Sequence, residues 1–120
     1  MSAVLLALAL AAAPLPPLRV ELVLQGHRFT PDEVTVPPGV PVEIHLRNRD
    51  SALEEFDSED LGVEQDVTPQ GDVRFTLPPL TPGLYRFMGE LHSDTARGRI
   101  VVAAPSDPSV AHCSSPHVTC

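Results

Sequence analysis

The stretch Val40-Pro41-Val42-Glu43-Ile44-His45-Leu46-Arg47 alternates aliphatic residues with polar residues or proline. A period of two residues is typical of a β-strand that buries one face and leaves the other in water. His45, which lies between the aliphatic positions, is therefore expected to point to solvent and not to bind a ligand. The stretch predicts a sheet protein and gives no sign of a helical domain.

The same period recurs along the rest of the chain. It appears at Val73, Phe75, Leu77, Tyr85 and Phe87, and weaker apolar runs cover residues 20–24, 34–36 and 100–103. Turns are expected at Pro37-Pro38-Gly39, Pro69-Gln70-Gly71 and Thr81-Pro82-Gly83, where proline fixes one backbone torsion and glycine supplies a positive one. Short strands separated by such turns predict an all-β antiparallel sandwich of about seven strands.

The composition limits the protein further. A chain of 120 residues suffices for one domain with a single core. With four Phe, one Tyr and no Trp, that core is expected to be mostly Val and Leu. The net charge of -8, with eight Arg and no Lys, argues against nucleic acid as a partner and favours cations.

The two ends of the chain differ in composition from the predicted sandwich at residues 18–104. Residues 4–13 form an apolar run that ends in three alanines, which predicts a signal peptide at residues 1–13 and export to the periplasm or beyond. The alternative is an uncleaved apolar strand or anchor. The run is too short for stable membrane insertion. Residues 105–120 are predicted to be a disordered tail, in which Cys113 and Cys120 form a local disulfide, bind metal together with His112 and His117, or stay free or pair between chains.

An acidic stretch interrupts the alternation. Half of all the acids of the chain lie between Asp50 and Asp66, and no basic residue lies among them. One interpretation is a solvated loop or short helical turn whose charges face water. The other is that several carboxylates converge with an imidazole on a cation such as cupric or ferric ion.

The run from Tyr85 to Gly98 resembles the ligand loop of small blue-copper proteins, which reads Tyr-x-Phe-x-Cys-x-x-His-x-x-x-Met-x-Gly. In this frame Gly89 stands at the cysteine, Ala96 stands at the methionine, and only His92 is retained. A thiolate and a thioether make a fast electron-transfer copper site. The loop is therefore not expected to carry electrons in that way.

Further segments appear in the order found in cupredoxins, and more narrowly they resemble the EfeO-type cupredoxin-like domain of bacterial iron-uptake systems. The segments are residues 29–42, 46–50, 54–58, 62–64, 80–87 and 89–102. The resemblance covers residues 20–103 and implies a cupredoxin-like Greek-key β-sandwich. It also implies copper(II) or iron(III) as the bound ion, with a membrane iron permease and a periplasmic peroxidase as system partners. Many of these proteins carry a large helical domain after this unit, so the full iron-delivery role is not expected from this unit alone.

The resemblance also implies a set of ligands. The implied metal ligands are Glu55, Glu64 and His92, with Glu54 as the rival to Glu55 and with Glu90, Asp94 and Met88 as supplementary ligands or supporting groups. Simpler interpretations stand beside these: His92 can be a hydrogen-bonded surface histidine, Met88 can be a packing residue, and His27 is expected to be a polar surface residue.

Three classes of function remain. The leading expectation is a non-enzymatic periplasmic protein that captures copper or ferric ion. The second is a metal-free sandwich that serves as a structural or partner-binding module. The third, an enzyme, is not expected, since the sequence contains neither a nucleophile motif nor the additional ligands of a copper oxidase.

Overall fold

The computed structural model describes residues 3–4 and 16–104. The predicted signal peptide, apart from residues 3–4, and the predicted tail with Cys113 and Cys120 lie outside the described residues. Within the described part of the chain, no helix has the length and apolar character needed to cross a membrane.

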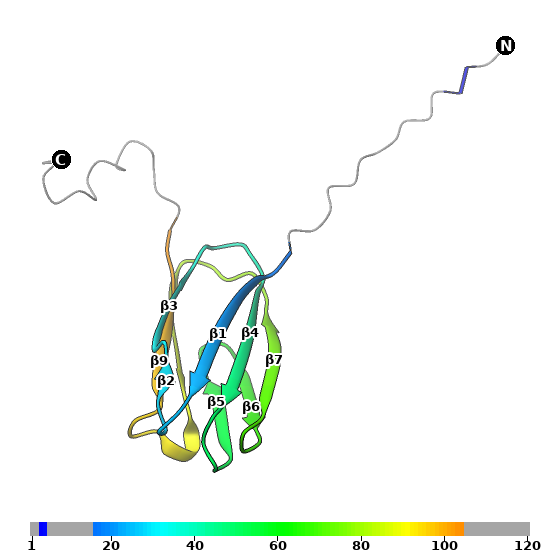
Figure 1. The fold of residues 1–120 in the computed structure, drawn as a ribbon. Coiled ribbons are helices and arrows are strands. Elements are labelled where there is room, and N and C mark those ends of the chain that lie inside the picture. The colour runs from blue at the N-terminus through cyan, green and yellow to red at the C-terminus, as the bar shows by residue number, and fades with distance from the viewer. Residues whose placement is uncertain (1–2, 5–15, 105–120) are drawn as a thin grey trace, which may run out of the picture.

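The described residues form nine strands and one short 3-10 helix. The strands are β1 (Leu18–Leu24), β2 (Phe29–Thr30), β3 (Glu33–Val36), β4 (Val42–Asn48), β5 (Glu54–Ser58), β6 (Val63–Val67), β7 (Asp72–Leu77), β8 (Gly83–Met88) and β9 (Arg97–Val102), and the helix η1 (Glu90–His92) precedes β9. They build a sandwich of two sheets, ordered β2-β1-β4-β7 and β3-β9-β8-β5-β6 (Figure 1). The predicted all-β sandwich is confirmed, with nine strands in place of about seven.

Both sheets are mixed, whereas an antiparallel sandwich was expected. β1 runs parallel to β4, and β3 runs parallel to β9, while the other pairs are antiparallel. The chain leaves the first sheet after β2, passes through β3 in the second sheet and returns as β4. Because of this crossover, β4 enters the first sheet in the direction of β1 and not against it.

The acidic stretch is not a loop or a helical turn; most of it forms the hairpin β5–β6. Glu54, Phe56 and Ser58 are buried at every second position of β5, so the strand has the period of two that a half-buried sheet requires. The sequence did not reveal this period, because Glu54 is acidic although its side chain points inward. The two strands of this hairpin and the two-residue strand β2 are the strands that none of the expected apolar runs covered.

The core is mostly Val and Leu, as expected, and it also contains Phe29, Phe56 and Phe87, with the partly buried Phe75 packed against it. Phe87 packs against Phe29 and Phe56 at ring-centroid distances of 4.9 and 4.8 Å, and Phe56 lies 5.0 Å from Phe75. Gly98 makes room for this cluster, since a Cβ there would lie 2.3 Å from Phe87 Cζ. Aromatic packing across both sheets thus adds to the aliphatic core.

His45 does not point freely into solvent, as its place on the alternating strand predicted. Its exposed fraction is 6%, because Glu21 of β1 and Asp72 of β7 reach over it from the two neighbouring strands. Nδ1 lies 3.1 Å from Glu21 Oε1, and Nε2 lies 2.8 Å from Asp72 Oδ2. Burial of the outward side of a central strand depends on neighbouring side chains, which the strand's own sequence does not reveal.

The turns lie where the sequence placed them, each between two strands. Gly39 has the expected positive φ of 75°, but in the turn before β7 the residue with positive φ is Gln70 and not Gly71. Gly71 is needed there for a different reason, since a Cβ would lie 2.3 Å from Thr68 Oγ1. The glycine thus permits a close approach of chain segments.

Candidate metal centre

Three possible metal donors meet at the end of the sandwich opposite the start of β1 and the end of β9. His27 comes from the turn between β1 and β2, Glu54 opens β5, and His92 ends η1, so each belongs to a different segment (Figure 1). Their ligand atoms all lie within 4.8 Å of one another. Imidazole nitrogen and carboxylate oxygen are both metal ligands, and three of them converge here.

Glu54 lies at the middle of this centre. His27 Nδ1 lies 2.7 Å from Oε1, and His92 Nδ1 lies 3.1 Å from Oε2. The Glu54 side chain has an exposed fraction of 0%, and a buried carboxylate is costly unless charge or hydrogen bonds compensate it. Both of its oxygens are directed at imidazole nitrogens, so the compensation comes from the two histidines.

The two histidines are packed against each other. The ring centroids of His27 and His92 lie 3.6 Å apart, and their planes differ by 17°. The side chains remain partly accessible, with exposed fractions of 42% and 30%. A buried anionic group beneath two accessible imidazoles forms a site that an ion can reach from solvent.

A tight turn presents His27. Gln25 and Arg28 exchange backbone hydrogen bonds of 3.0 and 3.3 Å, so only Gly26 and His27 lie between them. Both central residues have positive φ, 61° and 56°, as a two-residue hairpin turn of this hand requires. A histidine in the left-handed region is uncommon, and such residues often lie at functional sites.

Side chains from two other segments hold this turn. The Asp50 carboxylate accepts hydrogen bonds from the backbone N–H groups of Gly26 at 2.7 Å and His27 at 3.0 Å. Thr95 donates its hydroxyl to the His27 carbonyl at 2.6 Å. Partial burial raises the pKa of Asp50, but the backbone donors of His27 and Gly26 outweigh it, and the pKa ends below its ordinary value. The turn is therefore clamped by an ionised carboxylate.

A local hydrogen-bond ring holds His92. Its backbone N–H donates to the Gly89 carbonyl and its carbonyl accepts from the Ala96 N–H, both at 2.9 Å. The Gly89 N–H donates in turn to the Ala96 carbonyl at 2.9 Å. This closed loop fixes the direction of the imidazole without any metal.

The cysteine position of the blue-copper frame does face the centre. A Cβ at Gly89 would lie 3.8 Å from Glu54 Oε2 and only 2.9 Å from the Ala96 Cβ. The residues at the cysteine and methionine positions are thus packed against each other next to Glu54. The centre has nitrogen and oxygen donors where that frame has sulfur.

The predicted ligands Glu55, Glu64 and His92 do not form one set. Glu55, Glu64 and Glu90 form a separate group of carboxylates on the outer face of the five-stranded sheet. The division follows from the strand, because neighbouring residues of β5 point to opposite faces and only Glu54 points inward. The choice between Glu54 and Glu55 as partner of His92, which the sequence left open, falls on Glu54.

Among the described residues, no basic side chain forms an ion pair with Glu55, Glu64 or Glu90. Burial is the first cause that raises the pKa of Glu55 above its ordinary value, followed by the negative charges of Glu90, Asp66, Asp57 and Glu64. Exposed acidic groups of this kind are common without an ion, and the geometry alone does not make this group a metal site.

The two remaining predicted ligands, Asp94 and Met88, belong to neither donor group. Asp94 is exposed in the turn after η1 and belongs to neither donor group. Met88 ends β8 with an exposed fraction of 39%, beside Asp57 and Arg97 in the strand register. Its side chain lies on the outer sheet face.

His27 was not expected in the centre. The sequence did contain a signal, since Gln25-Gly26-His27-Arg28 lies between an apolar run and Phe29 and has the length of a two-residue hairpin. That turn shows that His27 is at a strand end. It does not show that this strand end meets Glu54 and His92.

The donor set is chemically suited to copper(II). Imidazole binds copper, zinc and iron, whereas thiolate and thioether favour copper(I). The two histidines supply nitrogen, and Glu54 supplies negative charge at a position where it is already shielded from water. Such a set fits an oxidised copper ion better than the reduced one.

Comparisons with known proteins agree with this fold. A family model described as a cupredoxin-like domain matches residues 1–102. An uncharacterized protein of Rickettsia prowazekii (strain Madrid E) is 39% identical over 85 residues, which are 71% of this chain and 68% of that protein.

Two solved structures show the same arrangement of strands. Auracyanin A, a blue copper protein from Chloroflexus aurantiacus, matches with a TM-score of 0.64 and 17% identity over 73% of this chain and 100% of that chain. The metal-binding domain of the Cu(I)-exporting ATPase CopA of Streptococcus pneumoniae D39, solved with Cu(I), matches with a TM-score of 0.62 and 15% identity over 72% of this chain and 85% of that chain. At these identities the likeness concerns the fold.

Proposed function

Because the chain belongs to the family of cupredoxin-like domains, we propose that it is a non-enzymatic metal-binding protein that holds copper(II) between His27, Glu54 and His92. The observation that carries the proposal is the Glu54 carboxylate, which has an exposed fraction of 0% and directs both oxygens at imidazole nitrogens. Hydrophobic burial alone does not account for an acid at this position. The two histidines compensate this carboxylate through hydrogen bonds, and a cation held between the three side chains would replace those hydrogen bonds with ligand bonds.

Each residue has a distinct part in this proposal. His27 and His92 supply neutral nitrogen donors at the accessible side of the centre, and Glu54 supplies the charged oxygen beneath them. Asp50 and Thr95 keep the His27 turn in place, and the hydrogen bonds between Gly89 and Ala96 keep the His92 loop closed. These supports orient the ligands before any ion arrives, which reduces the entropy lost on binding.

The proposal concerns capture and delivery of copper and not electron transfer. Gly89 and Ala96 leave the centre without the sulfur ligands of the blue-copper frame. A site of nitrogen and oxygen donors stabilises copper(II) over copper(I), so rapid exchange between the two oxidation states is not favoured.

The wider setting rests on sequence likeness. The apolar run at residues 4–13 supports export to the periplasm. The resemblance to EfeO-type domains supports a place in a bacterial iron or copper uptake system, with iron(III) as a second cargo and with a membrane iron permease and a peroxidase as partners. Copper(II) is the ion that we place first, since copper-binding proteins share the fold.

The test is a copper(II) competition titration on the full chain in which His112, Cys113, His117 and Cys120 are replaced by serine, so that this part of the chain does not contribute donors. Glu54→Gln and His92→Ala are each expected to weaken binding about tenfold or more, the scale seen for loss of supporting groups around metals. Glu64→Gln is the matched control, an acid of the outer group, and is expected to bind as the parent protein does.

Three results would contradict the proposal. Unchanged affinity in Glu54→Gln and His92→Ala would remove this centre, and loss of binding in Glu64→Gln alone would transfer it to the outer carboxylates. Absence of copper(II) binding in the parent protein would favour a metal-free module that binds another protein. The same titration with ferric ion separates copper from iron as the cargo.

A further inference from the structure

The outer face of the five-stranded sheet is divided into a basic half and an acidic half. β8 and β9 carry arginines on this face, and the neighbouring strands β5 and β6 carry carboxylates. The outward residues of the two halves are Arg86, Arg97 and Arg99 on one side and Glu55, Asp57, Glu64 and Asp66 on the other. β8 and β5 are adjacent in the sheet, so the two halves meet along one line.

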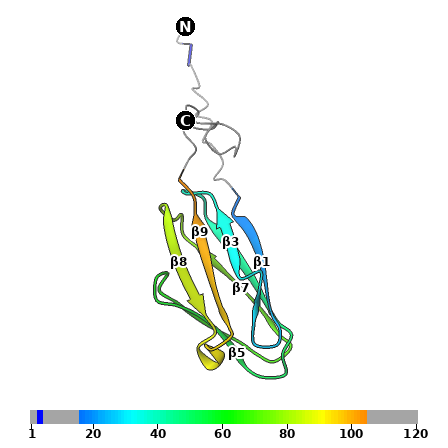
Figure 2. The ribbon, with the colours of Figure 1, turned by 90° about the vertical axis from the view of Figure 1, so that its left-hand side faces the viewer.

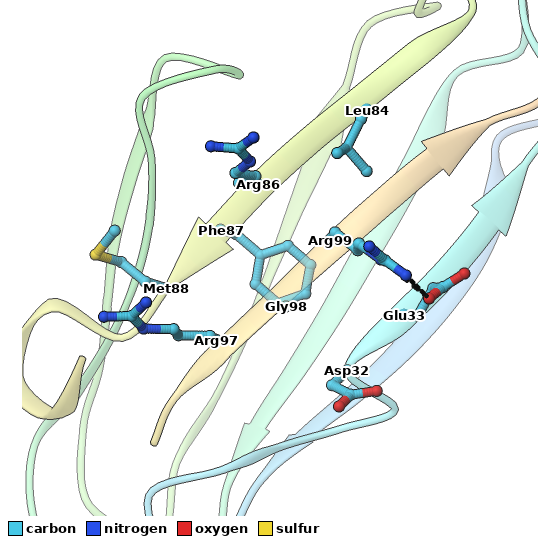
Figure 3. A pocket seen from close by; sticks show the side chains of 9 residues that line it. All are labelled: Asp32, Glu33, Leu84, Arg86, Phe87, Met88, Arg97, Gly98 and Arg99. Carbon is cyan, nitrogen blue, oxygen red and sulfur yellow. Dashed lines mark hydrogen bonds and ion pairs between the residues drawn. The ribbon is translucent and has the colours of Figure 1, made fainter. Parts of the chain in front are cut away.

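The basic half is an open groove of about 550 Å³ on the outer side of β8, β9 and β3 (Figure 3). Figure 2 shows these three strands side by side, with β8 at one edge of the view. Phe87 and Gly98 form the floor of the groove. Leu84 and Met88 stand beside the arginines with exposed fractions of 44% and 39%.

The arginines of the groove are poorly neutralised within the described residues. Only Arg99 reaches a carboxylate there, with Nη2 2.7 Å from Glu33 Oε2 (Figure 3). Arg97 donates Nε–H to the Ser93 carbonyl, which carries no net charge. Arg86 and Arg99 are direct cross-strand partners, and like charges in that relation destabilise a sheet.

The acidic half likewise contains cross-strand pairs of like charge. Glu55 lies opposite Asp66 and Asp57 lies opposite Glu64, so both outward pairs of the β5–β6 hairpin join like charges. The described residues provide no ion pair for any of these four carboxylates. Repulsion within each half would decrease if a surface of opposite charge covered both halves.

We propose that this face binds a second copy of the chain, in a symmetric dimer whose two-fold axis runs parallel to the strands between β8 and β5. Rotation about that axis places β8 and β9 of one copy over β5 and β6 of the other, so that the arginine-bearing strands face the carboxylate-bearing strands in both halves. Met88, Asp57, Arg97 and Glu64 lie in one row of the sheet register, which brings Arg97 over Glu64 of the second copy.

The geometry of packed sheets permits these contacts. Face-to-face sheets lie about 10 Å apart, a gap that an arginine and a glutamate span from opposite sides. Met88 and Leu84 lie on β8, next to the axis, and contribute apolar area where the rest of the face is charged. In a closed two-fold contact both halves of the face are covered in each copy, so association beyond two copies is not expected.

A second copy is favoured over other occupants because one chain carries both the arginine-bearing strands and the carboxylate-bearing strands on the same face. The net charge of -8 repels further copies at long range, so association depends on this local pattern. Contacts of this charged kind are weakened by salt, because the Debye length falls from about 10 Å at 0.1 M to about 3 Å at 1 M. The dimer is independent of the His27, Glu54 and His92 centre.

The test is sedimentation velocity of the full chain in EDTA and a reductant, which exclude bridging by metal or by the cysteines. A monomer–dimer equilibrium is expected that weakens on raising the salt from about 0.1 M to about 1 M. Arg97→Glu and Glu64→Arg are each expected to weaken the dimer about tenfold or more, since each variant places like charges at two symmetric contacts.

The decisive experiment exchanges the charges of Arg97 and Glu64. Mixing Arg97→Glu with Glu64→Arg gives a heterodimer with opposite charges at both contacts, the native pair at one and the reversed pair at the other. The double variant Arg97→Glu/Glu64→Arg restores opposite charges at both contacts of its own homodimer. The mixture and the double variant are both expected to recover the parent affinity. Both positions are exposed, and thermal melts verify the fold of each variant.

A chain that stays monomeric at low salt up to about millimolar concentration overturns the proposal and leaves the groove to a different partner. Association that continues past the dimer, or a double variant no tighter than the single ones, overturns the two-fold arrangement. Because EDTA is present throughout, none of these results depends on whether the metal centre binds copper.

Discussion

The imidazole ring of His27 lies flat against that of His92, with ring centroids 3.6 Å apart and Nδ1 of each ring directed at the same buried carboxylate. The two histidines come from opposite ends of the described chain. Because the two rings meet beside Glu54, the histidine retained in the loop belongs to a centre of three donors. The following predictions concern that centre and the sheet around it.

Replacement of His27 by alanine is expected to lower the copper(II) affinity about tenfold or more, because it removes one of two nitrogen donors. The electron paramagnetic resonance spectrum of bound copper(II) should show coupling to fewer nitrogens. His45→Gln is the matched control, a histidine of β4 that lies outside the centre and has both nitrogens directed at carboxylates. Equal loss in both variants would argue that His27 acts through folding and not as a ligand.

Gly89→Cys is expected to create a thiolate ligand in the centre, since a Cβ at this position lies 3.8 Å from Glu54 Oε2. Copper(II) should then give a strong thiolate-to-copper absorption band in the visible, which the parent protein lacks, and affinity for copper(I) should rise. The nearby Ala96 Cβ, at 2.9 Å, makes the position crowded, and overpacking is expected to cost about 1–3 kcal/mol of stability.

The control for this experiment is Gly89→Ser, which introduces a similar side chain without sulfur. It should show a comparable fall in melting temperature and no new absorption band. A Gly89→Cys protein that folds, binds copper and stays colourless would show that this position does not face the ligands.

Acid is expected to weaken the four-stranded sheet through the carboxylates beside His45. The hydrogen bond to His45 is the first cause that lowers the pKa of both Glu21 and Asp72 below their ordinary values of 4.5 and 3.8. A carboxyl group whose pKa is lower in the folded state stabilises the fold above its unfolded value, and this contribution is lost as the pH falls through the folded value. Both carboxylates are accessible, so the effect should be modest and reduced by salt.

His45→Gln tests this acid effect. The difference in melting temperature between the parent protein and the variant should be larger at about pH 6 than at about pH 2, which is well below the ordinary pKa of both acids. A difference that stays constant over this range would show that the His45 contacts with Glu21 and Asp72 do not contribute through charge.

Glu55→Gln is expected to raise the melting temperature of the metal-free protein near neutral pH. Burial and four neighbouring carboxylates raise the pKa of Glu55, so its charged form is less favourable in the folded than in the unfolded chain. The neutral amide removes this cost. The advantage should shrink as the pH falls through the folded pKa of Glu55, because the parent carboxyl then becomes neutral too.

Thermal melts in EDTA over a range of pH measure this effect. Glu43→Gln is a suitable control, since Glu43 lies within 3.9 Å of Arg19 on the other sheet and its loss should not stabilise the protein. A lower melting temperature for Glu55→Gln at neutral pH would be inconsistent with repulsion as the main effect at this position.

The sequence by itself determined the class of fold and one member of the centre. The alternation in residues 42–46 and the spacing of the turns are local properties, and they fixed the sandwich because strand pairs must bury one face. The frame around His92 in the loop before β9 likewise follows from short-range spacing. The sequence also indicated Glu54 as the alternative to Glu55, since the two residues are neighbours in the chain.

The tertiary structure alone decided which donors meet. Side chains of β5 alternate between the two faces of the sheet, with Glu54 inward and Glu55 outward. Which of the two residues points inward depends on how the strand pairs with β6 and β8. The fold of the β1–β2 turn against Asp50 and Thr95 brings His27 onto His92. Such contacts join residues far apart in the chain, and local spacing contains no information about them, because they are set by the packing of the whole sandwich.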